Sequence, residues 1–220
     1  MMRRRTDGRP LWRNLRSVRS TTSETEESAI TATQHVIENP ISGERIVIHR
    51  SGAETDGALL AWELVLAPGG RVPSSHAHPE QVERFAVVSG RLRFRVAGRT
   101  RILGPGESVT VPAGTVHSFA NAGREPVRVL VESTPALEME ALLETAAAMA
   151  QEQHAASRPM PRLLDLMLFM RDFEREVRAP FLPASLVRAV TRPLAWVARQ
   201  RGMDRHYRRL RARSGDGAVV

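Results

Sequence analysis

The chain has 220 residues, of which 42% are hydrophobic, and a formal net charge of +8. This length suits one domain of about 100 to 150 residues with appendages, and the hydrophobic content is sufficient for a packed core. No apolar run approaches the ~20 residues that a membrane-spanning helix needs. Cysteine is absent, which excludes disulfides, a thiol nucleophile and a zinc ribbon. The missing disulfides fit a reducing cytoplasm, where we expect the protein, although they do not exclude export.

The positive charge lies mainly towards the two ends of the chain. Residues 1–30 contain seven arginines and four acidic residues. Residues 31–135 contain eleven arginines and ten acidic residues, and residues 136–220 contain fourteen arginines and ten acidic residues. The central part is therefore almost neutral, which does not favour nucleic-acid binding. All 32 basic residues are arginines, and this indicates a bias of the coding DNA as much as phosphate binding. The lack of lysine also excludes Schiff-base chemistry.

Residues 1–30 are rich in Arg, Ser and Thr and show little apolar periodicity, so we predict a disordered basic tail. The apolar stretch of about 7 to 15 residues that a secretory signal requires is missing. Four apolar side chains could form one turn of helix, the alternatives being a tail or a misassigned start codon. They are Leu11, Trp12, Leu15 and Val18.

Short strands separated by turn residues are predicted over residues 31–135. Apolar residues alternate through 60–66, which predicts a strand with one buried face. Glu83, Phe85 and Val87 share a face in the same way, and the arginines of 91–95 should form the solvated face of another strand. Further strands are expected at residues 46–48, 99–103, 108–111, 115–120 and 127–132. Many short strands with Gly and Pro at regular intervals predict a sandwich or barrel.

Three histidines and a glutamate lie within this part of the chain at spacings that suit a metal site. His76 and His78 are two residues apart, so on an extended strand both side chains leave the same face. Glu83 follows after Pro79, which must interrupt the strand, and His117 comes from a separate strand. Three imidazoles and one carboxylate are a suitable ligand set for a divalent first-row transition metal.

The spacing of these residues and of the nearby turn residues resembles the cupin superfamily, in particular its small, single-domain cupin-2 type. The two motifs of that superfamily read G(X)5HXH(X)3,4E(X)6G and G(X)5PXG(X)2H(X)3N. Ten positions agree with them: Gly70, His76, His78, Glu83, Gly90, Gly106, Pro112, Gly114, His117 and Asn121. The resemblance covers roughly residues 35–135 and implies a mainly β jelly-roll barrel with the metal inside. Fifteen residues separate the motifs, which implies a single hairpin there.

The resemblance implies that His76, His78, Glu83 and His117 hold one divalent transition metal, which could be Fe, Mn, Ni, Cu or Zn. Glu83 would be both a ligand and the candidate catalytic proton carrier. We therefore expect a metal-dependent enzyme of dioxygenase, cyclase or isomerase type that acts on a small oxygenated molecule. The alternative is a non-catalytic cupin that binds or senses a small ligand. Sugar-epimerase chemistry is disfavoured because the single tyrosine, Tyr207, lies far from the motifs.

Other polar residues near the motifs receive simpler interpretations. Asn121 is expected to order the end of its strand, and Glu80 to be a solvated loop carboxylate rather than an acid or base. The histidines outside the motifs are expected not to be ligands. They are His35, His49, His154 and His206.

The remaining residues predict helices. The first should follow an N-cap at Thr134 with Pro135 as its first helical residue. A second is expected over about 162–178 before Pro180, and a third over about 184–201, stopped by a glycine.

Taken together, these patterns predict four parts: a disordered tail at 1–30, a cupin barrel at 31–135, an α-helical C-terminal extension at 136–213 and a second disordered tail at 214–220. We expect the helices to pack on the barrel or across a homodimer. Contact of the basic third helix with a membrane surface is a less favoured alternative. DNA binding is the least favoured, because no helix-turn-helix is evident.

Overall fold

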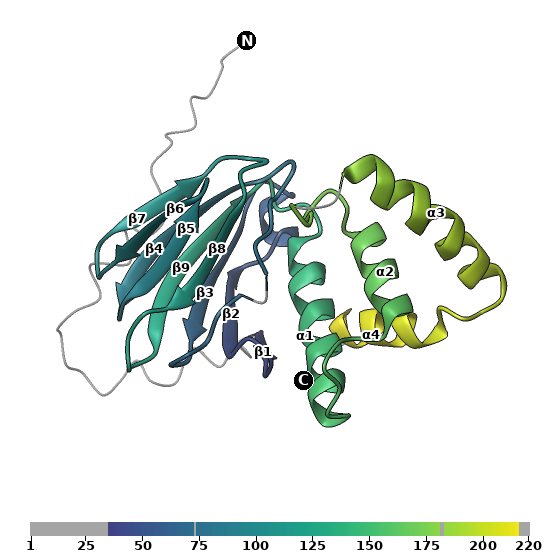
Figure 1. The fold of residues 1–220 in the computed structure, drawn as a ribbon. Helices are drawn as coiled ribbons and strands as arrows, with labels where there is room; N and C mark the ends of the chain where they lie inside the picture. The colour runs from purple at the N-terminus through teal and green to yellow at the C-terminus, as the bar shows by residue number, and fades with distance from the viewer. Residues whose placement is uncertain (1–34, 73, 181–182, 216–220) are drawn as a thin grey trace, which may run out of the picture. The chain divides into compact units, whose positions relative to one another are not determined.

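The computed structural model describes residues 35–72, 74–180 and 183–215 (Figure 1). The predicted tail at 1–30 and residues 216–220 of the second tail lie outside the described residues. The last helix continues to Gly215, past the predicted end of the helical part at 213.

Two antiparallel sheets form the β part of the molecule (Figure 1). The larger has the order β1-β2-β3-β9-β4-β7 and the smaller the order β6-β5-β8. The strands are β1 Val36–Asn39, β2 Glu44–Arg50, β3 Leu60–Leu66, β4 Val82–Ser89, β5 Leu92–Val96, β6 Arg99–Leu103, β7 Ser108–Val111, β8 His117–Asn121 and β9 Val127–Thr134. Phe85 of the larger sheet and Phe94 of the smaller lie 4.9 Å apart between ring centroids, so both sheets contribute to one core. The predicted mainly β jelly roll with a helical extension is confirmed.

Alternation along the strands selects the side chains that enter this core. In β3 the side chains of Leu60, Trp62, Leu64 and Leu66 are all buried. In β5 Leu92 and Phe94 are buried, whereas Arg93 and Arg95 are exposed on the other face. The solvated arginine face is therefore confirmed. It follows from the two-residue period of an extended chain, which sends neighbouring side chains to opposite sides.

Close packing explains why glycines occupy the first and last positions of the first motif. A Cβ atom at Gly90 would lie 2.8 Å from the carbonyl oxygen of Pro126, and Gly90 also has a φ of +81°. A Cβ atom at Gly70 would lie 2.8 Å from the carbonyl oxygen of Ala67. Any larger residue would push the backbone apart at both places. Between the motifs, β5 and β6 form the single expected hairpin.

Asn121 orders the end of β8, as predicted. Its side-chain amide donates to the carbonyl oxygens of Leu66, Ala67 and Glu125, and its amide oxygen accepts from the backbone of Gly123. One side chain thus satisfies backbone groups of two different loops.

The helices follow β9, and their starts and ends differ from the prediction in two places. They are α1 Met139–Ala155, α2 Leu163–Asp172, α3 Ala184–Gln200 and α4 Arg205–Gly215. The first does not begin after Thr134, which is the last residue of β9, because Leu137 has a φ of +47° that no α-helix accommodates. The second ends at Asp172 instead of 178, because the chain turns so that Phe173 enters the core. The third lies where it was predicted.

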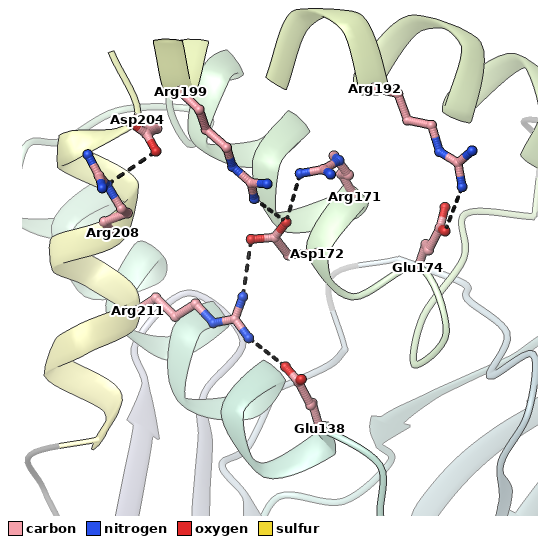
Figure 2. A network of polar contacts seen from close by, with 9 residues as sticks. All are labelled: Glu138, Arg171, Asp172, Glu174, Arg192, Arg199, Asp204, Arg208 and Arg211. Atoms are coloured by element: carbon pink, nitrogen blue, oxygen red, sulfur yellow. Dashed lines mark hydrogen bonds and ion pairs between the residues drawn. The ribbon is translucent and has the colours of Figure 1, made fainter. Parts of the chain in front are cut away.

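A network of ion pairs joins the ends of the helices (Figure 2). Asp172 at the end of α2 accepts hydrogen bonds from Arg199 of α3 and Arg211 of α4, and Arg211 also pairs with Glu138 just before α1. Such partly exposed pairs contribute little individually, about 0 to 1 kcal/mol each. The shared aspartate nevertheless lies where α2, α3 and α4 are linked.

Phe173 is the side chain through which the extension enters the barrel core. It is fully buried, belongs to the same apolar cluster as Phe85 and Phe94, and carries the guanidinium of Arg211 over its ring at 5.1 Å. The Phe173→Ala substitution should lower the free energy of unfolding by about 3 to 5 kcal/mol, because it leaves a large cavity. Urea denaturation measures this. Leu163→Ala, at a position 71% exposed on α2, is the control and should change stability by less than about 0.5 kcal/mol. Equal stability of both variants would show that the extension does not pack into the barrel.

Candidate metal centre

The chain around the first two histidines is extended but is not a regular strand. His76 pairs with His117 at the start of β8 through two backbone hydrogen bonds of 3.0 and 2.9 Å, which form an isolated bridge. Extended geometry sends the imidazoles of His76 and His78 to one side and Ala77 to the other. The expected strand is thus reduced to a bridge, but the expected shared face is present.

The structure brings together all four residues that the sequence singled out. A carboxylate oxygen of Glu83, Oε2, lies 3.1 Å from Nε2 of His78 and 3.1 Å from Nε2 of His117. One nitrogen from each of His76, His78 and His117 lies within 4.8 Å of the others. Glu83 and two of the histidines are almost completely buried, whereas His76 is partly exposed. The cluster is therefore inside the barrel, with His76 towards solvent.

Backbone carbonyl groups orient all three imidazoles. The Nδ1 atoms of His76 and His117 donate to the carbonyl oxygens of Ser74 and Thr115, each at 3.1 Å, and Nδ1 of His78 donates to the carbonyl oxygen of Glu176. A carbonyl can only accept, so each Nδ1 carries the proton. In the neutral ring each Nε2 then has a free lone pair, which is the form that binds a metal.

Charges within the cluster shift three pKa values. Partial removal from water, together with the neighbouring His117 and His78, lowers the pKa of His76 to about 4. Burial by itself would raise the pKa of Glu83, but His78 and His117 outweigh burial and hold that pKa well below its usual range. Burial would lower the pKa of His78, but Glu83 outweighs it and raises that pKa. The contacts with His78 and His117 thus keep the buried carboxylate ionised.

The donor atoms fit a cation. Oε2 of Glu83 and Nε2 of His117 are buried and have no hydrogen-bond partner in the described part of the chain, although they lie 3.1 Å apart. Buried polar atoms without partners are costly. Three imidazole nitrogens and one carboxylate oxygen suit Zn, Fe, Mn, Ni or Cu. These four residues could therefore hold one divalent transition metal.

Aromatic rings form the apolar wall behind the cluster. The ring of Phe94 is stacked on that of His117, with centroids 5.8 Å apart and planes 3° from parallel. Phe85 meets His117 edge-on at 6.0 Å, and Phe119 packs against both phenylalanines. Phe85, Phe94 and Phe119 thus form an aromatic lining around His117. It excludes water from the barrel side of the cluster.

The helical extension contributes directly to the site, which the sequence did not indicate. Besides the carbonyl of Glu176, the backbone of Arg178 exchanges two hydrogen bonds with Ala77, which lies between the two histidines. Arg175 pairs with Glu80 at 2.7 Å on the exposed rim, so Glu80 is the solvated carboxylate that was expected. Backbone pairing between segments about a hundred residues apart leaves no sequence signal, because it uses no side chain.

Two histidines outside the motifs lie in other polar clusters. His35 lies 3.3 Å from Glu140 and 2.9 Å from Glu144, beside a cavity of about 370 Å³. These three residues have the spacing of a possible cation site as well, and burial together with Glu140 raises the pKa of Glu144 to about 7. His206 bridges Asp165 and Glu152 at 2.7 and 2.8 Å, which ties α4 to α2 and α1.

Comparison with known proteins identifies the domain. The cupin domain family matches residues 62–132, which hold all four clustered residues. This part of the chain is a cupin domain, and the resemblance seen in the motifs is confirmed. Mannose-1-phosphate guanylyltransferase of Salmonella typhimurium is 32% identical over 57 residues, which are 26% of this chain and 12% of that protein. The match thus spans only a small part of that relative.

Three solved structures are similar to part of this chain. An RmlC-like cupin from Shewanella frigidimarina is 19% identical, with a TM-score of 0.42 and coverage of 52% of this chain and 96% of that one. A protein described as a predicted oxalate decarboxylase from Thermotoga maritima is 22% identical, with a TM-score of 0.40 and coverage of 42% and 80%. KdgF from Halomonas sp. is 20% identical, with a TM-score of 0.40 and coverage of 45% and 86%.

Among the described helices, none has the length and apolar content to cross a membrane.

The carbonyl contacts predict the tautomers of the three clustered histidines. In metal-free protein at a pH high enough for the three rings to be neutral, His76, His78 and His117 should all be protonated at Nδ1. Nitrogen-15 NMR of the imidazole rings distinguishes the two tautomers. The exposed His154 is the internal control and should show the mixture of an unrestrained ring. Protonation at Nε2 in any of the three would contradict the described orientation.

Proposed function

We propose that His76, His78, Glu83 and His117 bind one divalent transition metal and that the domain is a metal-dependent enzyme. Its substrate would be a small oxygenated molecule, and its reaction of dioxygenase, cyclase or isomerase type. The observation that carries the proposal is the cluster of three imidazole nitrogens beside a buried carboxylate, whose Oε2 lies 3.1 Å from Nε2 of both His78 and His117. The carbonyl acceptors fix this arrangement before any metal binds, so little conformational freedom is lost on binding.

Each residue has a distinct role in this proposal. The metal, when bound, supplies a Lewis acid, and with Fe, Mn, Ni or Cu also redox chemistry. The two buried histidines, His78 and His117, hold their rings rigidly, whereas the partly exposed His76 marks the side from which a substrate approaches. Glu83 balances positive charge and can accept or return a proton. The phenylalanine wall keeps water out behind the site.

The alternative function is a sensor that binds a small ligand without turnover. One observation favours it: the extension touches the site through the Glu176 carbonyl and the pairing of Arg178 with Ala77. A shift of His78 on ligand binding would move this segment and hence the end of α2. An enzyme does not require that connection, and a sensor does.

Metal analysis tests the proposed site. Purified full-length protein should contain about one equivalent of a transition metal, and a His78→Ala, His117→Ala double variant less than about a tenth of that. Glu83→Gln should bind metal more weakly, because it removes the negative charge. His49→Ala is the matched control, since His49 is largely exposed and pairs with Glu63 instead. Its metal content should equal that of the wild type.

The same samples separate the two functions. Fe, Mn, Ni or Cu would direct assays to dioxygen uptake, and Zn to cyclase or isomerase activity. A metal-dependent change in hydrogen exchange that spreads from 173–178 into α2 and α4, without turnover, would favour the sensor. If wild-type protein reconstituted with each metal in turn holds no more than the double variant, the metal site and the enzyme proposal both fail.

A further inference from the structure

Helix α3, Ala184–Gln200, has an inward face built from small side chains. Thr191, Ala195 and Ala198 are buried, and Ala195 belongs to an apolar cluster with Leu168 of α2. The contact with α2 therefore uses the small residues of the helix. Its large apolar residues are left for another surface.

Those large residues form a continuous exposed face. Leu186, Val190 and Leu194 follow each other at four-residue spacing and are 53%, 47% and 47% exposed, and Trp196 is 64% exposed. With Ala189 and Pro193 they cover an arc of roughly 160° at 3.6 residues per turn. Exposed leucines scattered singly need no explanation, but a continuous apolar face that includes a tryptophan indicates an interaction surface.

Arginines flank this apolar face on one side. Arg188, Arg192 and Arg199 lie between it and the buried face, and no acidic residue occurs anywhere from 178 to 203. Arg192 and Arg199 also pair with Glu174 and Asp172 at the end of α2, which anchors the helix (Figure 2). Arg188, and Arg201 just past the helix, are exposed and have no ion-pair partner among the described residues.

We propose that α3 is an interfacial helix that docks this chain on an anionic lipid surface. Its apolar face, with Trp196 at one edge, would enter the boundary between headgroups and acyl chains. Arg188 and Arg201, which have no ion-pair partner among the described residues, would meet the headgroup phosphates. A second copy of the chain fits less well. Two α3 helices paired through this face would bring Arg188 and Arg201 of both copies together, and no acidic residue between 178 and 203 could balance them.

Vesicle flotation of the full-length protein tests the proposal. The protein should float with phosphatidylcholine vesicles that contain about 30% phosphatidylglycerol, and binding to pure phosphatidylcholine should be at least about tenfold weaker. Raising the salt to about 0.5 M should release it from the anionic vesicles, because the headgroup attraction is screened.

Matched variants identify the residues responsible. The Leu186→Gln, Leu194→Gln variant should bind anionic vesicles at least about tenfold more weakly, since it removes apolar area that would enter the lipid. Leu163→Gln, at the exposed start of α2, should bind like the wild type. Arg188→Gln with Arg201→Gln should weaken binding to anionic vesicles alone. Arg93→Gln with Arg95→Gln, on the exposed face of β5, should not.

Three results would overturn the proposal. The first is absence of wild-type binding to anionic vesicles at low salt, and the second is an equal loss of binding in the α3 and control variants. The third is a wild-type dimer in sedimentation velocity that the Leu186→Gln, Leu194→Gln variant converts to a monomer while vesicles capture neither. That result would assign the face to a second copy. Unchanged circular dichroism in every variant would show that the fold is kept, and this control does not depend on the metal proposal.

Discussion

Hydrogen bonds from the three imidazole Nδ1 atoms to backbone carbonyls are the contacts on which the site depends. Each bond places the proton of a neutral ring on Nδ1, and each acceptor comes from a different segment of the chain. The Nε2 atoms of His78 and His117 lie 3.1 Å from the Glu83 carboxylate, and His76 completes the cluster. Because the acceptors are backbone atoms, the geometry of the site is fixed by the fold itself. Burying an ionised carboxylate is costly unless positive charge or hydrogen bonds compensate it. A cation at the centre of the cluster would provide that compensation.

This arrangement makes the helical extension part of the site. One of the three acceptors, the carbonyl of Glu176, belongs to the turn after α2, and Phe173 of the same turn is fully buried in the barrel core. The pairing of Arg178 with Ala77 adds backbone hydrogen bonds beside the histidines. The extension thus also orients residues of the histidine cluster, besides packing against the apolar core of the barrel. Whether the domain works as an enzyme or as a sensor, the position of His78 depends on residues 173–178.

The parts that could be predicted are those encoded in side-chain spacing. Alternation gave the buried faces of β3, β4 and β5, and motif spacing selected the four residues that the structure clusters. The start of α1 was missed because the positive φ of Leu137 is not visible in composition. The role of Glu176 was missed because its contact uses a carbonyl group. Tyr207, set aside because it lies far from the motifs, is buried in the contact between α4 and α2, where sequence alone gave it no partner.

The central claim is that a preformed set of imidazoles and one carboxylate holds a metal inside this barrel. Anomalous diffraction from crystals of the full-length protein, recorded on both sides of the absorption edge of the metal it carries, tests it most directly. The account predicts one anomalous peak about 2.0 to 2.3 Å from Nε2 of His76, His78 and His117 and from a carboxylate oxygen of Glu83. A peak at His35, Glu140 and Glu144 instead, or none at the four residues after metal loading, would contradict it.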